Sequence, residues 1–140
     1  MSKVNEIKKS PNRLLAVAFG AVYLVVALIG FAISGSSEFF ATDGAKVLGL
    51  FQVNHFHNVA HLLIGAALLY AGLKSVVAAK TANLVVGAAY LLLGIIGLFL
   101  VGSAANILAI NGADNVLHFA SAAVLLAVAL GTDKSTRARV

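Results

Sequence analysis

The sequence contains no cysteine and few charged residues. The absence of cysteine excludes disulfide frameworks, thiol catalysis, iron–sulfur clusters and zinc sites built from thiolates. Charged residues make up 11% of the 140 residues, whereas soluble domains average roughly 25%. Hydrophobic residues make up 61%, and the mean hydropathy is +0.99. A soluble globular domain is therefore excluded. A disordered chain is excluded too, because disordered chains are poor in hydrophobic residues. The composition indicates a polytopic membrane protein.

Four long apolar segments occupy most of the chain, at residues 14–34, 58–73, 82–102 and 115–131. A helix that crosses a bilayer needs about 20 apolar residues, with a range of ~17–25. The first and third segments meet this length, and the others meet it if their polar first turns lie inside the headgroup boundary. Because the runs are continuous, rich in Ala and Leu, and too long for strands, the sequence predicts an all-α fold of four transmembrane helices.

Two parts of the chain recur. Residues 20–24 (GAVYL) return as residues 87–91 (GAAYL), and residues 53–61 (VNHFHNVAH) return as residues 110–118 (INGADNVLH). We interpret the chain as two copies of one helix–loop–helix unit. Because each unit holds two spans, both units have the same orientation. An axis along the membrane normal then relates them, as in parallel repeats.

The basic residues are unevenly distributed around the predicted spans. The net charge is +5, and nine of the ten basic residues precede the first span, separate the second from the third, or follow the fourth. These nine are Lys3, Lys8, Lys9, Arg13, Lys74, Lys80, Lys134, Arg137 and Arg139. The positive-inside rule therefore predicts a multi-pass protein with both termini in the cytoplasm and only Lys46 outside. Because the basic residues flank spans, we expect contact with membrane lipid and no nucleic-acid partner.

This topology divides the chain into five parts. They are a basic cytoplasmic N-terminal segment (1–13), a first two-helix repeat (14–73) with a long outer loop (35–57), a cytoplasmic loop (74–81), a second two-helix repeat (82–131) and a basic cytoplasmic tail (132–140).

Small residues recur at helical spacing in the first and third spans. The two stripes are Gly20, Tyr23, Ala27, Gly30 and Ser34, and Gly87, Tyr90, Gly94 and Gly97. Since small residues let helix backbones approach each other in lipid, we predict that the stripes are packing seams that face each other across the pseudo-twofold axis. Tyr23 and Tyr90 lie near mid-membrane, where each hydroxyl needs a hydrogen-bond partner. That partner is either a carbonyl of a neighbouring helix or a ligand such as a quinone.

A polar motif is repeated at the outer ends of the second and fourth spans. It reads Asn-x-x-(His or Asp)-Asn-x-x-His, and it is formed by Asn54, His57, Asn58 and His61 and by Asn111, Asp114, Asn115 and His118. His57 and His61 are four residues apart, so they share one face of a helix. The pseudo-twofold axis places His61 and His118 at equal depth.

The first of three interpretations of this motif is structural. Asp114 and Asn58 suit helix N-caps, where a side-chain oxygen accepts a hydrogen bond from a free backbone N–H group. His61 and His118 then donate hydrogen bonds to carbonyls of the short apolar segments 47–53 and 104–110, because backbone at that depth must be satisfied by protein.

The other two interpretations involve a cofactor. Three imidazoles and a carboxylate, from His57, His61, Asp114 and His118, suit Zn or Cu(II). Alternatively, His61 and His118 are the axial ligands of a haem b inside a four-helix bundle.

The remaining chemistry of the sequence argues against transport and catalysis. No charged residue lies in the central part of any predicted span, although transporters and proton relays usually carry one. We expect a structural or accessory membrane protein without enzymatic activity or cofactor, which packs with itself or with a larger membrane complex. The alternative is a redox or sensing module that binds haem b or a divalent transition metal at the outer leaflet.

Three stretches of the chain resemble one known family. They are residues 12–16, residues 48–54 together with His57, Asn58 and His61, and residues 111–118. They resemble domain of unknown function 4383, a bacterial family of four-helix membrane proteins that is common in actinobacteria, and the resemblance covers about residues 12–131. It implies a four-span protein of the bacterial plasma membrane with the Asn/His motif as its signature, and it implies no activity. His55 departs from the family pattern, since many relatives have proline there, and we do not expect it to be an essential ligand.

Overall fold

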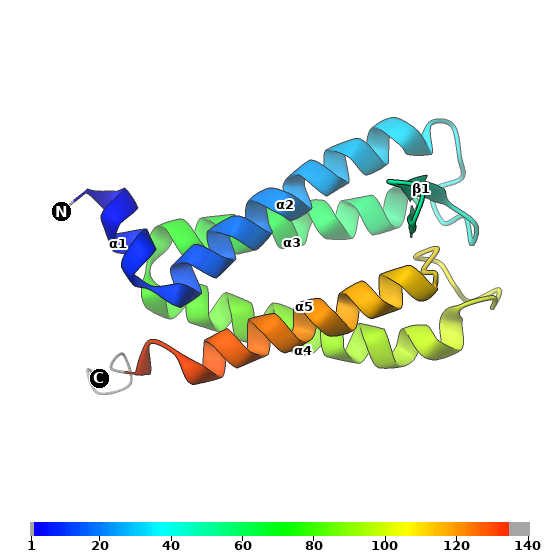
Figure 1. Ribbon diagram of the computed structural model, residues 1–140. Coiled ribbons are helices and arrows are strands. Elements are labelled where there is room, and N and C mark those ends of the chain that lie inside the picture. The colour runs from blue at the N-terminus through cyan, green and yellow to red at the C-terminus, as the bar shows by residue number, and fades with distance from the viewer. Residues whose placement is uncertain (1, 135–140) are drawn as a thin grey trace.

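The computed structural model describes residues 2–134. Its elements in chain order are α1 (Lys3–Lys9), α2 (Pro11–Ser34), β1 (Ala45–Val47), β2 (Phe51–Val53), α3 (His55–Lys74), α4 (Val76–Leu100) and α5 (Gly112–Gly131). The long helices α2 to α5 form an elongated bundle (Figure 1). The predicted all-α fold is confirmed. The two short strands pair antiparallel as a hairpin in the connection between α2 and α3.

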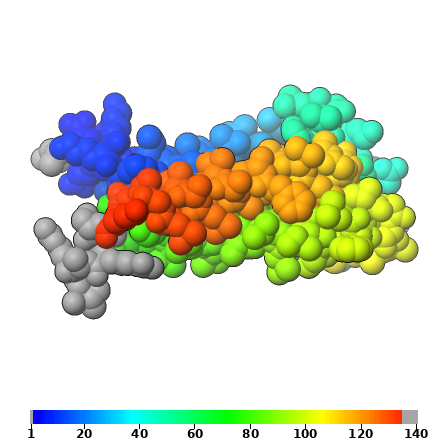
Figure 2. All heavy atoms as spheres, turned by 60° about the horizontal axis from the view of Figure 1, so that its bottom comes forward, coloured from blue at the N-terminus to red at the C-terminus, as the bar shows by residue number. Residues whose placement is uncertain are grey.

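The bundle consists of two helix pairs. Helix α2 packs mainly on α3, and α4 packs mainly on α5 (Figure 1). Figure 2 shows α5 and α4 side by side along one face of the molecule, with the hairpin region at one end. Among residues 2–134, four helices are long and apolar enough to cross a membrane, and they are α2, α3, α4 and α5.

The two ends of the bundle differ in charge. One end carries α1, the junction between α3 and α4, and the end of α5, whereas the hairpin and the connection between α4 and α5 lie at the opposite end (Figure 1). Seven basic residues belong to the first end, which we call the basic end: Lys3, Lys8, Lys9, Arg13, Lys74, Lys80 and Lys134. Lys46 lies in the hairpin at the other end, which we call the hairpin end. Arg137 and Arg139 lie outside the described residues.

The helix starts differ from the predicted ones. Asn54 caps helix α3, and its side-chain oxygen accepts a hydrogen bond from the backbone N–H of His57 at 2.8 Å. Asn111 caps α5, and its side-chain oxygen accepts a hydrogen bond from the backbone N–H of Asp114 at 2.9 Å. The prediction that Asp114 and Asn58 are N-caps is therefore wrong. Asp114 instead occupies the third helical position, where its carboxylate accepts the Asn111 backbone N–H and completes a capping box.

The predicted cytoplasmic loop 74–81 is also wrong, because α4 already begins at Val76. Ser75 alone separates the two helices. Its backbone N–H bonds to Ala71, and its hydroxyl accepts the Ala78 N–H at 3.1 Å. One serine therefore ends α3 and caps α4, as its N-cap propensity allows. The N-terminal segment likewise contains α1 and the first turn of α2, which Ser10 caps with Pro11 following it.

The glycine seams lie within each helix pair. A Cβ atom on Gly20 would approach Leu69 N of α3 at 2.5 Å, and one on Gly87 would approach Leu126 Cγ of α5 at 2.9 Å. The prediction that the two stripes face each other is therefore wrong for their glycines, and it holds only for the two tyrosines. The glycines lie where two helix backbones come closest, which is between the two helices of each pair. Between the two helix pairs, the rings of Tyr23 and Tyr90 stack with their centroids 5.5 Å apart.

The basic end is closed by buried polar contacts of α2. Arg13 is 5% exposed, and its guanidinium donates to the carbonyls of Gly72 and Leu73 at 2.8 and 3.0 Å. These carbonyls belong to the last turn of α3, where carbonyls lack a partner within the helix. Arg13 therefore ties the start of α2 to the end of α3.

Asp133 connects α2 to the end of α5. Its carboxylate accepts the Asn12 backbone N–H at 3.1 Å, the Asn12 amide at 2.9 Å and the Ser10 hydroxyl at 2.9 Å. Burial opposes ionisation of this carboxyl. The hydrogen bonds from Asn12 and Ser10 and the charge of Lys80 outweigh burial, and they hold the pKa of Asp133 below its ordinary value.

Candidate functional site: a buried histidine cluster beside a lateral cavity

Three histidines meet near the hairpin end of the bundle. Helix α3 supplies His57 and His61, one turn apart, and α5 supplies His118. One ring nitrogen from each lies within 4.8 Å of the others. The ring centroid of His57 is 4.3 Å from that of His61 and 6.0 Å from that of His118. The three side chains are 2%, 6% and 2% exposed in chain order. We call them the histidine cluster.

Most ring nitrogens of the histidine cluster lack a protein partner. Within residues 2–134, both nitrogens of His57 and the Nδ1 atoms of His61 and His118 are buried without a hydrogen bond. The predicted hydrogen bonds from His61 and His118 to the segments 47–53 and 104–110 are not formed. Of these two segments, the backbone of Gln52 and that of Leu108 interact with His57 instead, without reaching hydrogen-bond geometry.

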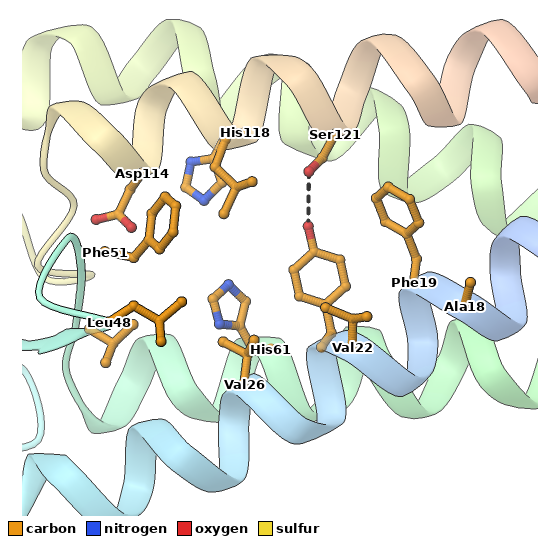
Figure 3. Close-up of a pocket in the computed structure, with 13 residues that line it drawn as sticks. Ala18, Phe19, Val22, Val26, Leu48, Phe51, His61, Asp114, His118 and Ser121 are labelled. Atoms are coloured by element: carbon orange, nitrogen blue, oxygen red, sulfur yellow. Dashed lines mark hydrogen bonds between the residues drawn. The ribbon is translucent and has the colours of Figure 1, made fainter.

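Two tyrosines pack against the histidine cluster on the side that faces the middle of the bundle. The Tyr23 ring lies 5.2 Å from the His61 ring, and the Tyr90 ring stacks on His118 at 5.2 Å. The Tyr23 hydroxyl donates to Ser121 Oγ at 3.1 Å (Figure 3). Its partner is thus a side chain and not the expected helix carbonyl. These contacts hold the imidazoles in place from the middle of the bundle.

The Tyr90 hydroxyl is buried without a hydrogen-bond partner in the part of the chain that is described. The pairing of Tyr23 with Ser121 explains the difference. Ser121 corresponds to Ile64 when residues 53–61 are aligned with residues 110–118. Because isoleucine has no hydroxyl, the equivalent partner for Tyr90 is missing.

A cavity of about 440 Å³ lies beside the histidine cluster, between α2 and α5. Its walls are mostly apolar, and Phe19 and Val22 of α2 and Phe51 of the hairpin contribute to them (Figure 3). Its polar end is formed by His61 and His118, whose rings point toward each other across the space (Figure 3). Three lining residues, Val22, Leu48 and Leu117, are themselves exposed. The cavity therefore opens sideways on the outer surface of the bundle.

Asp114, which the sequence placed with the three histidines as a possible ligand, lies outside the histidine cluster. Its Oδ2 atom accepts the backbone N–H groups of Asn111 at 2.9 Å and Gln52 at 3.2 Å. The carboxylate therefore joins the start of α5 to β2, and it lines the cavity. His55 lies apart from the cluster, where its ring is 3.1 Å from the Gly35 carbonyl and stacks near Phe31.

The asparagines of the motif anchor loops and fill the seams. Asn54 Nδ2 donates to the carbonyls of Ala41 and Ile107 at 2.8 and 2.7 Å, and Asn111 Nδ2 donates to Leu50 O at 2.8 Å. Asn58 and Asn115 occupy equivalent places, since a Cβ atom on Gly30 or Gly97 would meet their side-chain oxygens.

Sequence reasoning missed Ser121 as a member of the site. A signal was present, because Ser121 lies three residues after His118 and hence on the same face of the helix. A hydroxyl on that face of an apolar span needs a partner. The Tyr23 hydroxyl is that partner.

The cluster does not fit a bis-histidine haem. A porphyrin extends on every side of its iron, between the two axial imidazoles. Here the His57 ring lies beside the line between His61 and His118, and Tyr23 and Tyr90 pack on the inner side. The cavity lies on one side of His61 and His118, whereas a porphyrin needs space on every side of its iron.

Comparisons with known proteins place the chain in a family without a described activity. No curated protein and no solved structure matches it. A family model described as a domain of unknown function, number 4383, matches residues 13–131. This match covers α2 except for its first two residues, all of α3, α4 and α5, and the whole Asn/His motif. The chain therefore belongs to the family of domain of unknown function 4383.

Proposed function

We propose that this protein is a structural or accessory component of a bacterial plasma membrane, which packs with itself or with a larger membrane complex. It crosses the membrane four times, with both termini in the cytoplasm. It is built from two parallel copies of one two-helix unit.

The outward faces of the four long helices support this proposal most directly. Large apolar side chains remain exposed along them, among them Val25 of α2, Leu63 of α3, Leu92 of α4 and Leu130 of α5. Exposed apolar surface on this scale is unstable in water and marks a lipid or protein contact. Lipid covers some of these faces, and neighbouring protein covers the rest.

The absence of charge inside the spans favours an accessory role over transport. The charged residues of the long helices lie among the first or last five residues of each helix, at Arg13, Lys74, Lys80 and Asp114. Their central parts carry none. An ion or proton pathway through a membrane usually requires an ionisable group at that depth.

The orientation of the protein in the membrane follows from the different numbers of basic residues at the two ends of the bundle. The basic end holds seven described basic residues and the hairpin end holds Lys46 alone. The positive-inside rule places the end richer in Lys and Arg in the cytoplasm.

Single cysteines test the topology cleanly, because the natural chain has none. In intact cells, Ser37→Cys in the outer connection reacts with a membrane-impermeant maleimide. Lys74→Cys at the basic end reacts only after the membrane is permeabilised. Both side chains belong to exposed residues. The reverse pattern would overturn the topology.

Cross-linking in native membranes tests the packing role. A cysteine in place of Val85, which is 63% exposed on α4, is oxidised at low expression level. The proposal expects a covalent dimer or a defined larger adduct from a cysteine on at least one helix face. A chain that stays monomeric with cysteines on all four faces would overturn it.

A further inference from the structure

We propose that His57, His61 and His118 bind one transition-metal ion of the kind that prefers imidazole nitrogen, zinc or copper. The ion lies near the hairpin end, with one coordination position open toward the lateral cavity. This binding site goes beyond the accessory role proposed above and does not depend on it.

The unpartnered ring nitrogens carry this inference. Four buried nitrogen atoms of the histidine cluster have no hydrogen-bond partner among the described residues. Buried polar groups in proteins are almost always paired, so a set of orphaned atoms on three adjacent rings needs an explanation. A metal ion satisfies one nitrogen on each ring at once.

The geometry needs little adjustment. Imidazole nitrogens bind zinc at about 2.0–2.1 Å, so two tetrahedral ligands lie about 3.4 Å apart. The three nitrogens here lie within 4.8 Å of one another. Small rotations of the rings therefore close the site. The backbone needs no rearrangement, because His57 and His61 already lie one turn apart on α3.

Duplication of the motif does not account for this set. Position 57 corresponds to Asp114 in the second copy, where the carboxylate forms a capping box with Asn111. An imidazole cannot reproduce that carboxylate contact, and the His57 ring turns toward His61 instead. The two copies therefore differ at this position, and the first supplies a third imidazole to the cluster where the second has a helix-capping carboxylate.

The chemistry of the donors selects the metal. Three imidazoles suit zinc and copper, and copper binds more tightly at a given nitrogen site. Magnesium and calcium require oxygen ligands. Since three neutral rings leave the charge of the ion uncompensated, an anion or water from the cavity completes the coordination sphere. The Asp114 carboxylate lines the same cavity.

The test uses the full chain, purified in detergent with a tag that contains no histidine and stripped with a chelator. Equilibrium dialysis against zinc chloride, copper sulfate or magnesium chloride, followed by elemental analysis, measures the bound metal. We expect one zinc or one copper ion per chain and no magnesium. Competition between zinc and copper, and the metal content of protein isolated without chelator, distinguish the two. Wild-type protein that binds neither zinc nor copper stoichiometrically overturns the proposal.

Substitutions test the ligand set. His57→Gln, His61→Gln and His118→Gln each weaken binding at least ~100-fold, because loss of a supporting partner alone costs 10–100-fold. His55→Gln is the matched control and leaves binding unchanged. Retained affinity in all three cluster variants overturns the assignment.

Cobalt substitution covers the case in which a cluster variant does not fold. The wild-type protein with Co²⁺ in place of the native ion gives the visible absorption of a low-coordinate site. A spectrum identical to that of hydrated cobalt overturns the proposal.

Discussion

Replacement of Gly20 by alanine tests how α2 and α3 are held together. The new Cβ atom would lie 2.5 Å from Leu69 N, 2.8 Å from Gly65 O and 2.9 Å from Leu69 Cα. All three are backbone atoms of a rigid helix, so no side-chain rotation relieves the clash. The two helices must move apart.

The size of the effect follows from these distances. Ordinary van der Waals contact begins at 3.4 Å, so α2 and α3 must separate by about 1 Å at this crossing. Overpacking of this kind costs ~1–3 kcal/mol. The better helix propensity of alanine returns up to about 1 kcal/mol. In lipid the hydrophobic effect does not drive helices together, so their association depends on close packing of the backbones. We therefore expect Gly20→Ala to lower the free energy of unfolding by ~2 kcal/mol.

Two other glycines serve as controls. The three atoms nearest to a Cβ atom on Gly87 are side-chain atoms of Leu125 and Leu126, at 2.9–3.1 Å. The Leu126 atoms move with the rotamer of that side chain, so the clash is milder than at Gly20. A Cβ atom on Gly112 meets nothing within 4 Å. Unfolding in mixed micelles with increasing dodecyl sulfate, followed by circular dichroism, should rank stability as Gly112→Ala, then Gly87→Ala, then Gly20→Ala. A Gly20→Ala protein as stable as Gly112→Ala would refute the backbone clash.

Other contacts give further expected outcomes. Ser121→Ala leaves the buried Tyr23 hydroxyl unpaired and lowers stability by ~1–3 kcal/mol; Tyr23→Phe in the same chain recovers most of this loss, and the absence of recovery in the double mutant would contradict the pairing. Tyr90→Phe removes a hydroxyl that already lacks a partner, so its unfolding curve is unchanged or shifted to higher stability, and a clear loss would show a partner that the structure lacks. Because the pKa of Asp133 is lower in the folded protein than its ordinary value of 3.8, its contribution to stability is present above that pH and is lost as the pH falls through the folded pKa. Asp133→Asn therefore melts earlier than the natural protein at pH 7, and the gap narrows at acid pH; a gap that stays constant would rule out the carboxylate as its source.

The histidine cluster adjoins the lateral cavity, because His61 and His118 line it. The cavity is apolar along α2 and polar where His61 and His118 reach it. A pocket of this kind holds the apolar part of a molecule and orients its polar end.

The sequence by itself determined the number of long apolar helices. It also determined which of the connections between them lie at the same end of the bundle. Both depend on quantities that are local in the chain. A run of about 20 apolar residues matches the thickness of the hydrocarbon core, and the spacing of Lys and Arg marks the connections. Four helices long and apolar enough to cross a membrane are accordingly present as α2 to α5. The duplicated motif also predicted His57, His61, Asp114 and His118 as one set, and the structure brings the three histidines of that set together without Asp114.

Helix limits were predicted less well, for a physical reason. Polar residues at a helix start look like loop in a hydropathy pattern, although a backbone with a good cap continues as helix through them. Asn54 and Asn111 each extend a helix by about one turn before the apolar run, and Ser75 removes a loop. The capping residues are present in the sequence, but a hydropathy pattern places the start of a helix at the first apolar residue and not at its cap.

Only the tertiary structure decided which faces meet. The glycine stripes could have packed across the axis or within the pairs, because a stripe of small residues specifies close approach and not a partner. The rotation of each helix about its own axis, set by all contacts along its length, places the stripes inside the pairs and turns the rings of Tyr23 and Tyr90 toward each other. The same rotations bring His118 of α5 to His57 and His61 of α3 and leave a cavity beside them. Helical periodicity assigns a residue to a face of its own helix. Distances between residues on different helices depend on how those helices pack.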